Sequence, residues 1–272
     1  MADDSRVETG GEPAARVRKT PVPLPDDSML DRLESVALWG AGVSWLVPSL
    51  GTMTLLQHLL SADRIERLNR LYCSVQIALT GSRWEAVVHP KVDPERPYLF
   101  MQNHTNHFDH VAMYNASPHF KQGIELEAHF KYPFYGWFMR SRGTIGVPTA
   151  RKGRTARIRE QMQAEVERNH SILGFPEGTR TTTGRLGKLR TGLFFIARDI
   201  GLPIVPTTVT GMYDLMRKGS ALIRPGHRLT VYMDEPIEMA GRNELEVLEA
   251  VEQTRAAMSG RIEAYWRERG YE

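Results

Sequence analysis

Residues 102–110 read QNHTNHFDH, so three histidines and one aspartate fall within nine consecutive positions. Imidazole and carboxylate side chains this close together can support two kinds of chemistry. They can coordinate a zinc or iron ion. Alternatively, one histidine and one aspartate can form a general-base pair in which the carboxylate orients the imidazole.

A metal site is the less favoured of the two. The metallo-hydrolase pattern H-x-H-x-D-H is nearly present, because His107, Asp109 and His110 occupy its last three positions. Its first position falls on Thr105, however, and His104 lies one residue away. A shift of one residue turns an imidazole away from the ion. We therefore expect no bound metal and keep a metallo-hydrolase built on this cluster as an alternative of another class.

A general-base pair would use His104 and Asp109, in the spacing H-x-x-x-x-D. On a continuous helix, residues five apart point in different directions and do not meet easily. The two side chains can meet if a strand ends near Gln102 and a helix begins near Asn106. Asp109 would then hold one ring nitrogen as N–H and leave the other free to accept a proton.

A second motif lies about seventy residues further along the chain. Residues 172–184 read ILGFPEGTRTTTG, a short apolar strand followed by a proline–glycine turn. An H-x-x-x-x-D motif preceded by asparagine and followed at this distance by FPEGTR, residues 175–180, resembles the glycerolipid acyltransferases, the family of 1-acylglycerol-3-phosphate acyltransferase. The blocks GLPIVPTTVTG (201–211) and YPFYGWFMRSRGTIGVPTARKGR (132–154) are similar to the remaining elements of that family.

The resemblance implies the roles of the site residues. His104 would be the catalytic base and Asp109 its orienting partner, while His107 and His110 would have no catalytic role. The residues expected to bind the acceptor lie at one arginine and along the Glu-Gly-Thr-Arg turn: Arg151, Glu177, Gly178, Thr179 and Arg180. The two arginines would hold the acceptor phosphate, with Arg154 as a competitor for the role of Arg151. Glu177 would order the turn, pair with an arginine or contact glycerol hydroxyls.

The family also implies a reaction. A fatty acyl group would pass from acyl-CoA or acyl carrier protein to a lysophospholipid, most favourably 1-acylglycerol-3-phosphate, with no further cofactor. Another acceptor, such as a lyso-amino-acid lipid or glycerol 3-phosphate, remains an alternative, because Ala150 stands where the family usually has aspartate and Leu189 where it favours phenylalanine. The sequence has no G-x-S-x-G elbow and no evident role for Cys73, so we expect direct transfer without an acyl-enzyme.

The elements that must position these residues alternate between strands and helices. Short runs rich in branched or aromatic residues predict strands at 98–101, 171–175, 203–209 and 228–234. Helical patterns cover residues 151–168, 188–200 and 244–266. This alternation indicates an α/β fold with a central mixed sheet flanked by helices. We expect the α/β acyltransferase domain to occupy residues 81–272.

The N-terminal part of the chain has a different composition. Residues 1–28 are polar and rich in turn formers, which predicts a disordered tail without a secretory signal. Residues 35–62 contain no Asp, Glu, Lys or Arg, and Pro48, Ser49 and Gly51 interrupt them. We interpret residues 29–80 as membrane-associating helices that begin with an apolar helical hairpin, the alternative being a buried hairpin of the core.

Composition limits the remaining possibilities. The chain has 272 residues, 41% of them hydrophobic and 25% charged, which is typical of a globular protein. With 35 basic and 32 acidic residues, the formal net charge of +3 gives no support for nucleic-acid binding. A single cysteine excludes an intrachain disulfide and favours a reducing compartment. We therefore expect a membrane-associated protein on the cytoplasmic face.

Overall fold

A computed structural model describes the chain except residues 1–20, 24–26, 61, 118–120, 151 and 272. Within the described residues, seven strands form one sheet in the order β1-β7-β6-β2-β5-β3-β4. The strands are β1 (Arg83–Val88), β2 (Leu99–Gln102), β3 (Lys121–Leu126), β4 (Ile145–Val147), β5 (Ser171–Gly174), β6 (Ile204–Thr210) and β7 (Arg228–Met233). Neighbouring strands are parallel except β6 and β7, which are antiparallel. The predicted mixed α/β sheet is confirmed.

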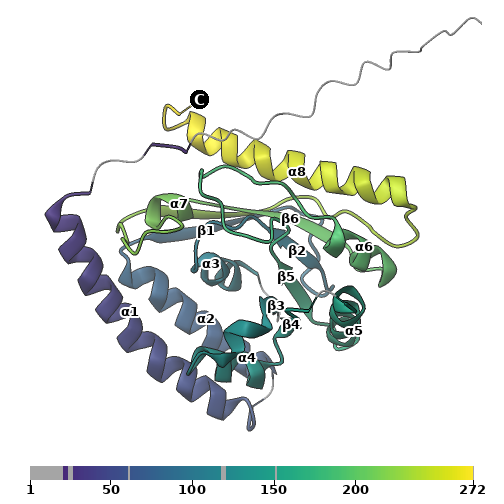
Figure 1. Cartoon of the computed structure of the whole chain (residues 1–272), viewed down its shortest axis with the longest axis horizontal. Helices are drawn as coiled ribbons and strands as arrows, with labels where there is room; N and C mark the ends of the chain where they lie inside the picture. The colour runs from purple at the N-terminus through teal and green to yellow at the C-terminus, as the bar shows by residue number, and fades with distance from the viewer. Residues whose placement is uncertain (1–20, 24–26, 61, 118–120, 151, 272) are drawn as a thin grey trace, which may run out of the picture.

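Helices cover both faces of this sheet (Figure 1). They are α1 (Met29–Leu56), α2 (Ala62–Leu79), α3 (Asp109–Ala116), α4 (Tyr135–Arg142), α5 (Arg154–Val166), α6 (Gly192–Asp199), α7 (Met212–Leu215) and α8 (Glu244–Arg267), with a short 3-10 helix η1 (Glu127–Lys131) before α4. Helix α8 runs along one face, whereas α2 and α3 lie on the other with α1 outside them. The predicted helices near α5, α6 and α8 are present.

Strand β2 shows how the sheet divides the core into two layers. Leu99 and Met101 belong to the cluster that includes α8 residues such as Trp266, whereas Phe100 belongs to the cluster that includes Cys73 of α2. All of these side chains are buried, at 0 or 1% exposure. Alternate residues of a strand face opposite sides, so the three consecutive apolar residues Leu99 to Met101 are each needed to fill one of the two layers. The short all-apolar run in the sequence therefore marks a central strand.

The prediction that Pro48, Ser49 and Gly51 break the apolar N-terminal stretch is wrong. Helix α1 continues through Pro48 to Leu56, and the chain reverses only after it. A proline inside a helix removes one backbone hydrogen bond and costs about 3 kcal/mol. Leu50 and Met53, within the next turn and a half, are 2% and 3% exposed in the core, so packing holds the helix beyond the proline.

The helical hairpin itself is present, formed by α1 and α2. The indole Nε1 of Trp45 donates a hydrogen bond to the carbonyl of Tyr72 at 3.2 Å, which ties the two helices together. Helix α2 carries charged residues, among them Arg64, Glu66 and Arg67, so only the first helix of the pair is apolar throughout its central part. The hairpin therefore turns later than predicted, and its second helix is amphipathic.

Helix α1 is long and apolar enough to cross a membrane, by length and composition. It has 28 residues, and only 11% of its most apolar window, whose mean hydropathy is 1.3, is buried inside the protein. A helix of the core would be mostly buried, so this exposure is compatible with membrane association. The predicted tail lies mostly outside the described residues; within it, Val22 is buried and its N–H donates to the carbonyl of Thr183 at 3.0 Å.

Candidate active site

The two sequence motifs meet at the edge of the sheet formed by the carboxyl ends of its parallel strands. Strands β2 and β5 are parallel neighbours, with Leu99 opposite Ile172, so their carboxyl ends lie side by side. His104 follows β2 and Glu177 follows β5. The N–H of Thr181 donates to the carbonyl of His104 at 2.7 Å, which joins the two loops directly. Ligands of open α/β sheets bind at such carboxyl ends.

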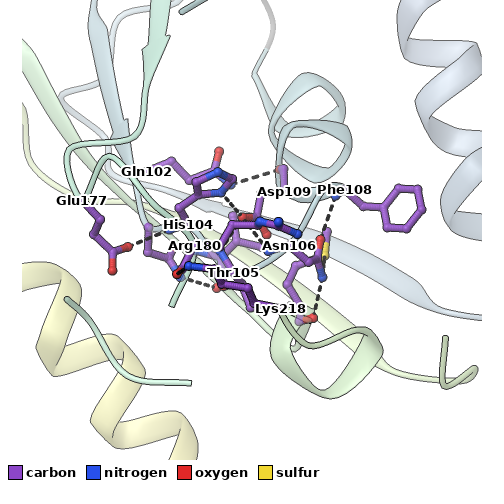
Figure 2. Close-up of polar contacts among 12 residues, drawn as sticks. Gln102, His104, Thr105, Asn106, Phe108, Asp109, Glu177, Arg180 and Lys218 are labelled. Carbon is purple, nitrogen blue, oxygen red and sulfur yellow. Dashed lines mark hydrogen bonds and ion pairs between the residues drawn. The ribbon is translucent and has the colours of Figure 1, made fainter. Parts of the chain in front are cut away.

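His104 and Asp109 form a hydrogen-bonded pair (Figure 2). His104 Nδ1 lies 2.8 Å from Asp109 Oδ2. Asp109 is the first residue of α3 and is 1% exposed, whereas the His104 side chain keeps 24% of its surface exposed. The structure thus brings the two residues together through the strand, turn and helix expected from the sequence.

The surroundings of Asp109 fix the direction of the imidazole. Its Oδ2 also accepts hydrogen bonds from the N–H groups of Thr105 and Asn106. Burial raises the pKa of Asp109, and the hydrogen bond from His104 is the largest contribution against that rise. Because an ionised carboxylate only accepts, Nδ1 carries the proton and Nε2 keeps its lone pair. The ring also stacks on Phe175, with centroids 4.1 Å apart.

Glu177 connects the turn after β5 to the catalytic loop, the segment of residues 103–108 that carries His104. Its Oε1 accepts the N–H of His104 at 2.7 Å, and its Oε2 accepts the N–H of Gly187 at 2.7 Å. The side chain is 5% exposed, and burial raises its pKa to about 7. Of the roles left open by the sequence, these contacts favour ordering of the turn. Gly178 has φ +65°, and a Cβ there would lie 2.6 Å from Arg190 Nε.

Arg180 ends the turn beside the histidine–aspartate pair (Figure 2). Burial and then the positive charge of Arg180 lower the pKa of His107, which places the guanidinium within electrostatic reach of this loop. Among the described residues, no carboxylate forms an ion pair with Arg180. Lys218, in the loop after α7, donates to Thr179 Oγ1 at 2.9 Å and to the Arg180 carbonyl at 3.1 Å. A guanidinium without a carboxylate partner can bind phosphate oxygens in pairs.

The structure gives no support for a role of the remaining candidates in the site. Arg151 falls outside the described residues, and its competitor Arg154, at the start of α5, donates to the Thr149 carbonyl at 2.6 Å. His110 packs edge-on against Tyr114, with centroids 6.1 Å apart, and burial lowers its pKa to about 4. In the part of the chain that the structure describes, no three His, Cys, Asp or Glu side chains are grouped as metal ligands.

Two asparagines and a lysine that the sequence did not single out as site residues also hold the loop. The Asn103 side chain pairs with both backbone groups of Val209, accepting at 2.7 Å and donating at 3.0 Å. Asn106 donates to the Met212 carbonyl at 2.6 Å. Of these three residues, only Asn103 is marked in the sequence, because it directly precedes His104 in the motif. The partners of Asn106 and Lys218 depend on contacts distant in the sequence.

An apolar cavity adjoins the same loop. It lies between α1, α2 and α3, with Phe108 from the catalytic loop and Met212 from α7 in its wall. Trp39 and Gly42 of α1 line the opposite side. Its lining is almost entirely apolar, which suits contact with a hydrocarbon chain.

Comparison with known proteins agrees with these features. Residues 85–210 match the sequence family described as Acyltransferase. A chloroplastic 1-acyl-sn-glycerol-3-phosphate acyltransferase of Brassica napus is 26% identical over 221 residues, 79% of this chain and 64% of that protein. One from Saccharomyces cerevisiae is 27% identical over 206 residues, 70% of this chain and 64% of that protein. The alignments thus cover less than two thirds of these relatives.

A solved structure shows the same fold. The 1-acyl-sn-glycerophosphate acyltransferase of Thermotoga maritima superposes with a TM-score of 0.72 at 17% sequence identity. The superposition covers 87% of this chain and 96% of that one. The matched domain and the named relatives, together with the paired motifs at the edge of the sheet, identify residues 85–210 as an acyltransferase domain similar to that of the 1-acylglycerol-3-phosphate acyltransferases.

Proposed function

We propose that the protein transfers a fatty acyl group from acyl-CoA or acyl carrier protein to the free hydroxyl of 1-acylglycerol-3-phosphate, giving phosphatidate. The observation that carries this proposal is the His104–Asp109 pair, 2.8 Å apart, beside a guanidinium on the adjacent turn. A base for a hydroxyl proton and a cation for a phosphate are what this acceptor requires. The named relatives support the same acceptor.

The chemistry would proceed in one complex of donor and acceptor. Nε2 of His104 takes the hydroxyl proton as the hydroxyl oxygen attacks the thioester carbonyl, and Asp109 stabilises the imidazolium. When the tetrahedral intermediate collapses, the carbon–sulfur bond breaks and the thiolate takes the proton from the imidazolium. No protein nucleophile is needed. Cys73 is not suited to act as a nucleophile, because it is 0% exposed and burial raises the pKa of its thiol.

The two ends of the lysolipid would be held separately. The Arg180 guanidinium would bind the phosphate, with Lys218 fixing the turn that carries it. The apolar cavity beside Phe108 would receive an acyl chain, because its lining is almost entirely hydrocarbon and it adjoins the catalytic loop. Helix α1, whose most apolar window is 11% buried, would associate with the membrane that supplies the lysolipid. Soluble thioester donors and the single reduced cysteine favour the cytoplasmic face.

A panel of acceptors tests the proposal. Thiol release from acyl-CoA or acyl carrier protein is measured with 1-acylglycerol-3-phosphate, glycerol 3-phosphate, a lyso-amino-acid lipid and monoacylglycerol, which has the same hydroxyl but no phosphate. We expect 1-acylglycerol-3-phosphate to be the preferred acceptor. Arg180→Ala should remove the preference for this acceptor over monoacylglycerol. Lys188→Ala, an exposed cation of the same loop, is the matched control. Absence of thiol release with every lysolipid, or equal rates with monoacylglycerol in the wild type, would contradict the proposal.

A further inference from the structure

Three aromatic side chains project from the surface between η1 and α4. Tyr132, Phe134 and Trp137, here called the aromatic corner, are 54%, 36% and 49% exposed. The rings of Phe134 and Trp137 contact one another, with centroids 5.1 Å apart. Large apolar side chains gathered on a surface mark contacts with a partner or a membrane.

The backbone holds the corner in a strained shape. Phe134 has φ +57° and ψ −61°, and the N–H of Tyr135 donates to the carbonyl of Pro133 at 2.6 Å, which closes a tight γ-turn. A bulky residue in such a conformation costs about 1–3 kcal/mol. Gly136 fixes the turn against η1, because a Cβ there would lie 2.2 Å from the Phe130 carbonyl oxygen. The fold thus bears strain while leaving an aromatic ring partly exposed.

The corner continues the exposed apolar surface at the end of α1. Gln57, just after α1, donates through Nε2 to Ser141 Oγ of α4 at 2.9 Å. Trp137 precedes Ser141 by one helical turn and so lies on the same side of α4. Leu55 and Leu59, on either side of Gln57, are 72% and 80% exposed. Figure 1 shows α4 beside the end of α1, and the two helices are in contact.

The charges around the corner indicate what it contacts. Lys131 and Arg140 flank it and are exposed. Basic residues beside tryptophan and tyrosine are typical of the polar interface of a bilayer that contains anionic lipids. A globular protein partner would not explain why the same patch continues into a helix long enough to span a membrane.

The corner also adjoins the candidate site. The Tyr132 ring stacks on His129, with centroids 5.4 Å apart, and His129 Nδ1 lies 2.8 Å from Glu125 Oε1. Glu125 is in β3, whose carboxyl end lies at the same edge of the sheet as the end of β5. A membrane contact at the corner would therefore lie near the edge of the sheet that carries His104.

We infer that Phe134 and Trp137 insert into the interfacial layer of an anionic bilayer, as a second membrane contact beside α1 that presents the site to its lipid substrate. The inference rests on the proposed function for one part only, the presentation of the site to a lipid substrate. Its physical content is the depth of the corner in the bilayer, which can be measured without any enzymatic activity.

A fluorescent label reports that depth in the full-length protein. Cys73 is the only cysteine and is 0% exposed, so Lys131→Cys supplies a single accessible thiol next to the corner. Glu249→Cys, exposed on α8 across the sheet, is the matched control. With vesicles of phosphatidylcholine and phosphatidylglycerol, a nitroxide lipid should quench an environment-sensitive dye at residue 131 and leave residue 249 unaffected. Equal, weak quenching at both positions overturns the inference.

Substitution of the corner gives a second readout. Phe134→Ser with Trp137→Ser should weaken vesicle binding roughly tenfold, since each ring would lose partial burial in lipid. Leu245→Ser, an exposed apolar residue of α8, should leave binding unchanged. Thiol release should fall with vesicle-borne acceptor and persist with a monomeric short-chain acceptor. Unchanged vesicle binding overturns the inference, whereas quenching at residue 131 without thiol release from any acceptor overturns only the proposed function.

Discussion

Replacing Glu177 with glutamine tests whether this side chain orders the catalytic loop. Both carboxylate oxygens accept backbone hydrogen bonds, from His104 and Gly187 at 2.7 Å each. Glutamine keeps the shape but offers an NH₂ group to one of the two N–H donors, so one hydrogen bond is lost. Leaving a buried donor unsatisfied costs about 1–3 kcal/mol. At roughly 2–4 °C per kcal/mol, the fall in Tm is readily measured.

The pH dependence of this loss has a definite sign. Burial raises the pKa of Glu177 from 4.5 to about 7. As the pH rises through 4.5, the unfolded chain releases this proton first, so the wild-type free energy of unfolding falls by about 3 kcal/mol until pH 7. Glutamine does not titrate. We therefore expect the free energy of unfolding of Glu177→Gln to rise relative to that of the wild type as the pH increases from 5 to 8.

Chemical unfolding at pH 5 and 8, together with steady-state kinetics, provides the assay. If Glu177 positions His104, Glu177→Gln lowers kcat and leaves the acceptor KM nearly unchanged, because the base is displaced while the phosphate site remains. Glu238→Gln, which removes an exposed ion pair with Arg96, is the matched control. If the free energy of unfolding of Glu177→Gln instead falls relative to that of the wild type as the pH rises, the raised pKa of Glu177 is refuted. An unchanged Tm with a raised acceptor KM refutes the positioning role.

Three further substitutions test other parts of the site. Asp109→Asn should reduce kcat by roughly 10²–10⁴ with little change in KM, because the imidazole loses the partner that sets its tautomer; near-normal turnover would contradict the pairing. Arg180→Ala should chiefly raise the KM for 1-acylglycerol-3-phosphate, and an unchanged KM would remove the phosphate assignment. Gly42→Leu should shift donor or acceptor preference toward shorter acyl chains, because Gly42 lines the apolar cavity; an unaltered chain-length profile would show that the chain lies elsewhere.

The contact between His104 and Asp109 and the core strands could be predicted because their signals are local. His104 and Asp109 are five residues apart, and the FPEGTR turn is contiguous in the sequence. Strand β2 is buried on both faces, so its first three residues form an apolar run in the sequence. By contrast, β1 lies at one edge of the sheet and most of its residues are exposed, so its sequence, RWEAVV, lacks the pattern of a buried strand.

Other features depend on contacts between distant residues. Lys121 starts β3 and is 0% exposed, and its charge is balanced by Glu66 of α2 at 3.3 Å. A lysine in a sequence usually indicates a surface position, so this strand was not predicted. Pro48 likewise suggested a break that packing of Leu50 and Met53 prevents. The role of Glu177 follows from the N–H of Gly187, which no spacing rule identifies.

The most direct test of the account is the turnover of His104→Ala beside that of His107→Ala. Both remove an imidazole from the same loop, but only His104 is hydrogen-bonded to Asp109 among the described contacts. Acyl transfer to 1-acylglycerol-3-phosphate is followed by thiol release, with folding checked by circular dichroism. We predict that His104→Ala abolishes turnover in a folded protein while His107→Ala retains it. Near-normal turnover of His104→Ala would contradict the general-base mechanism.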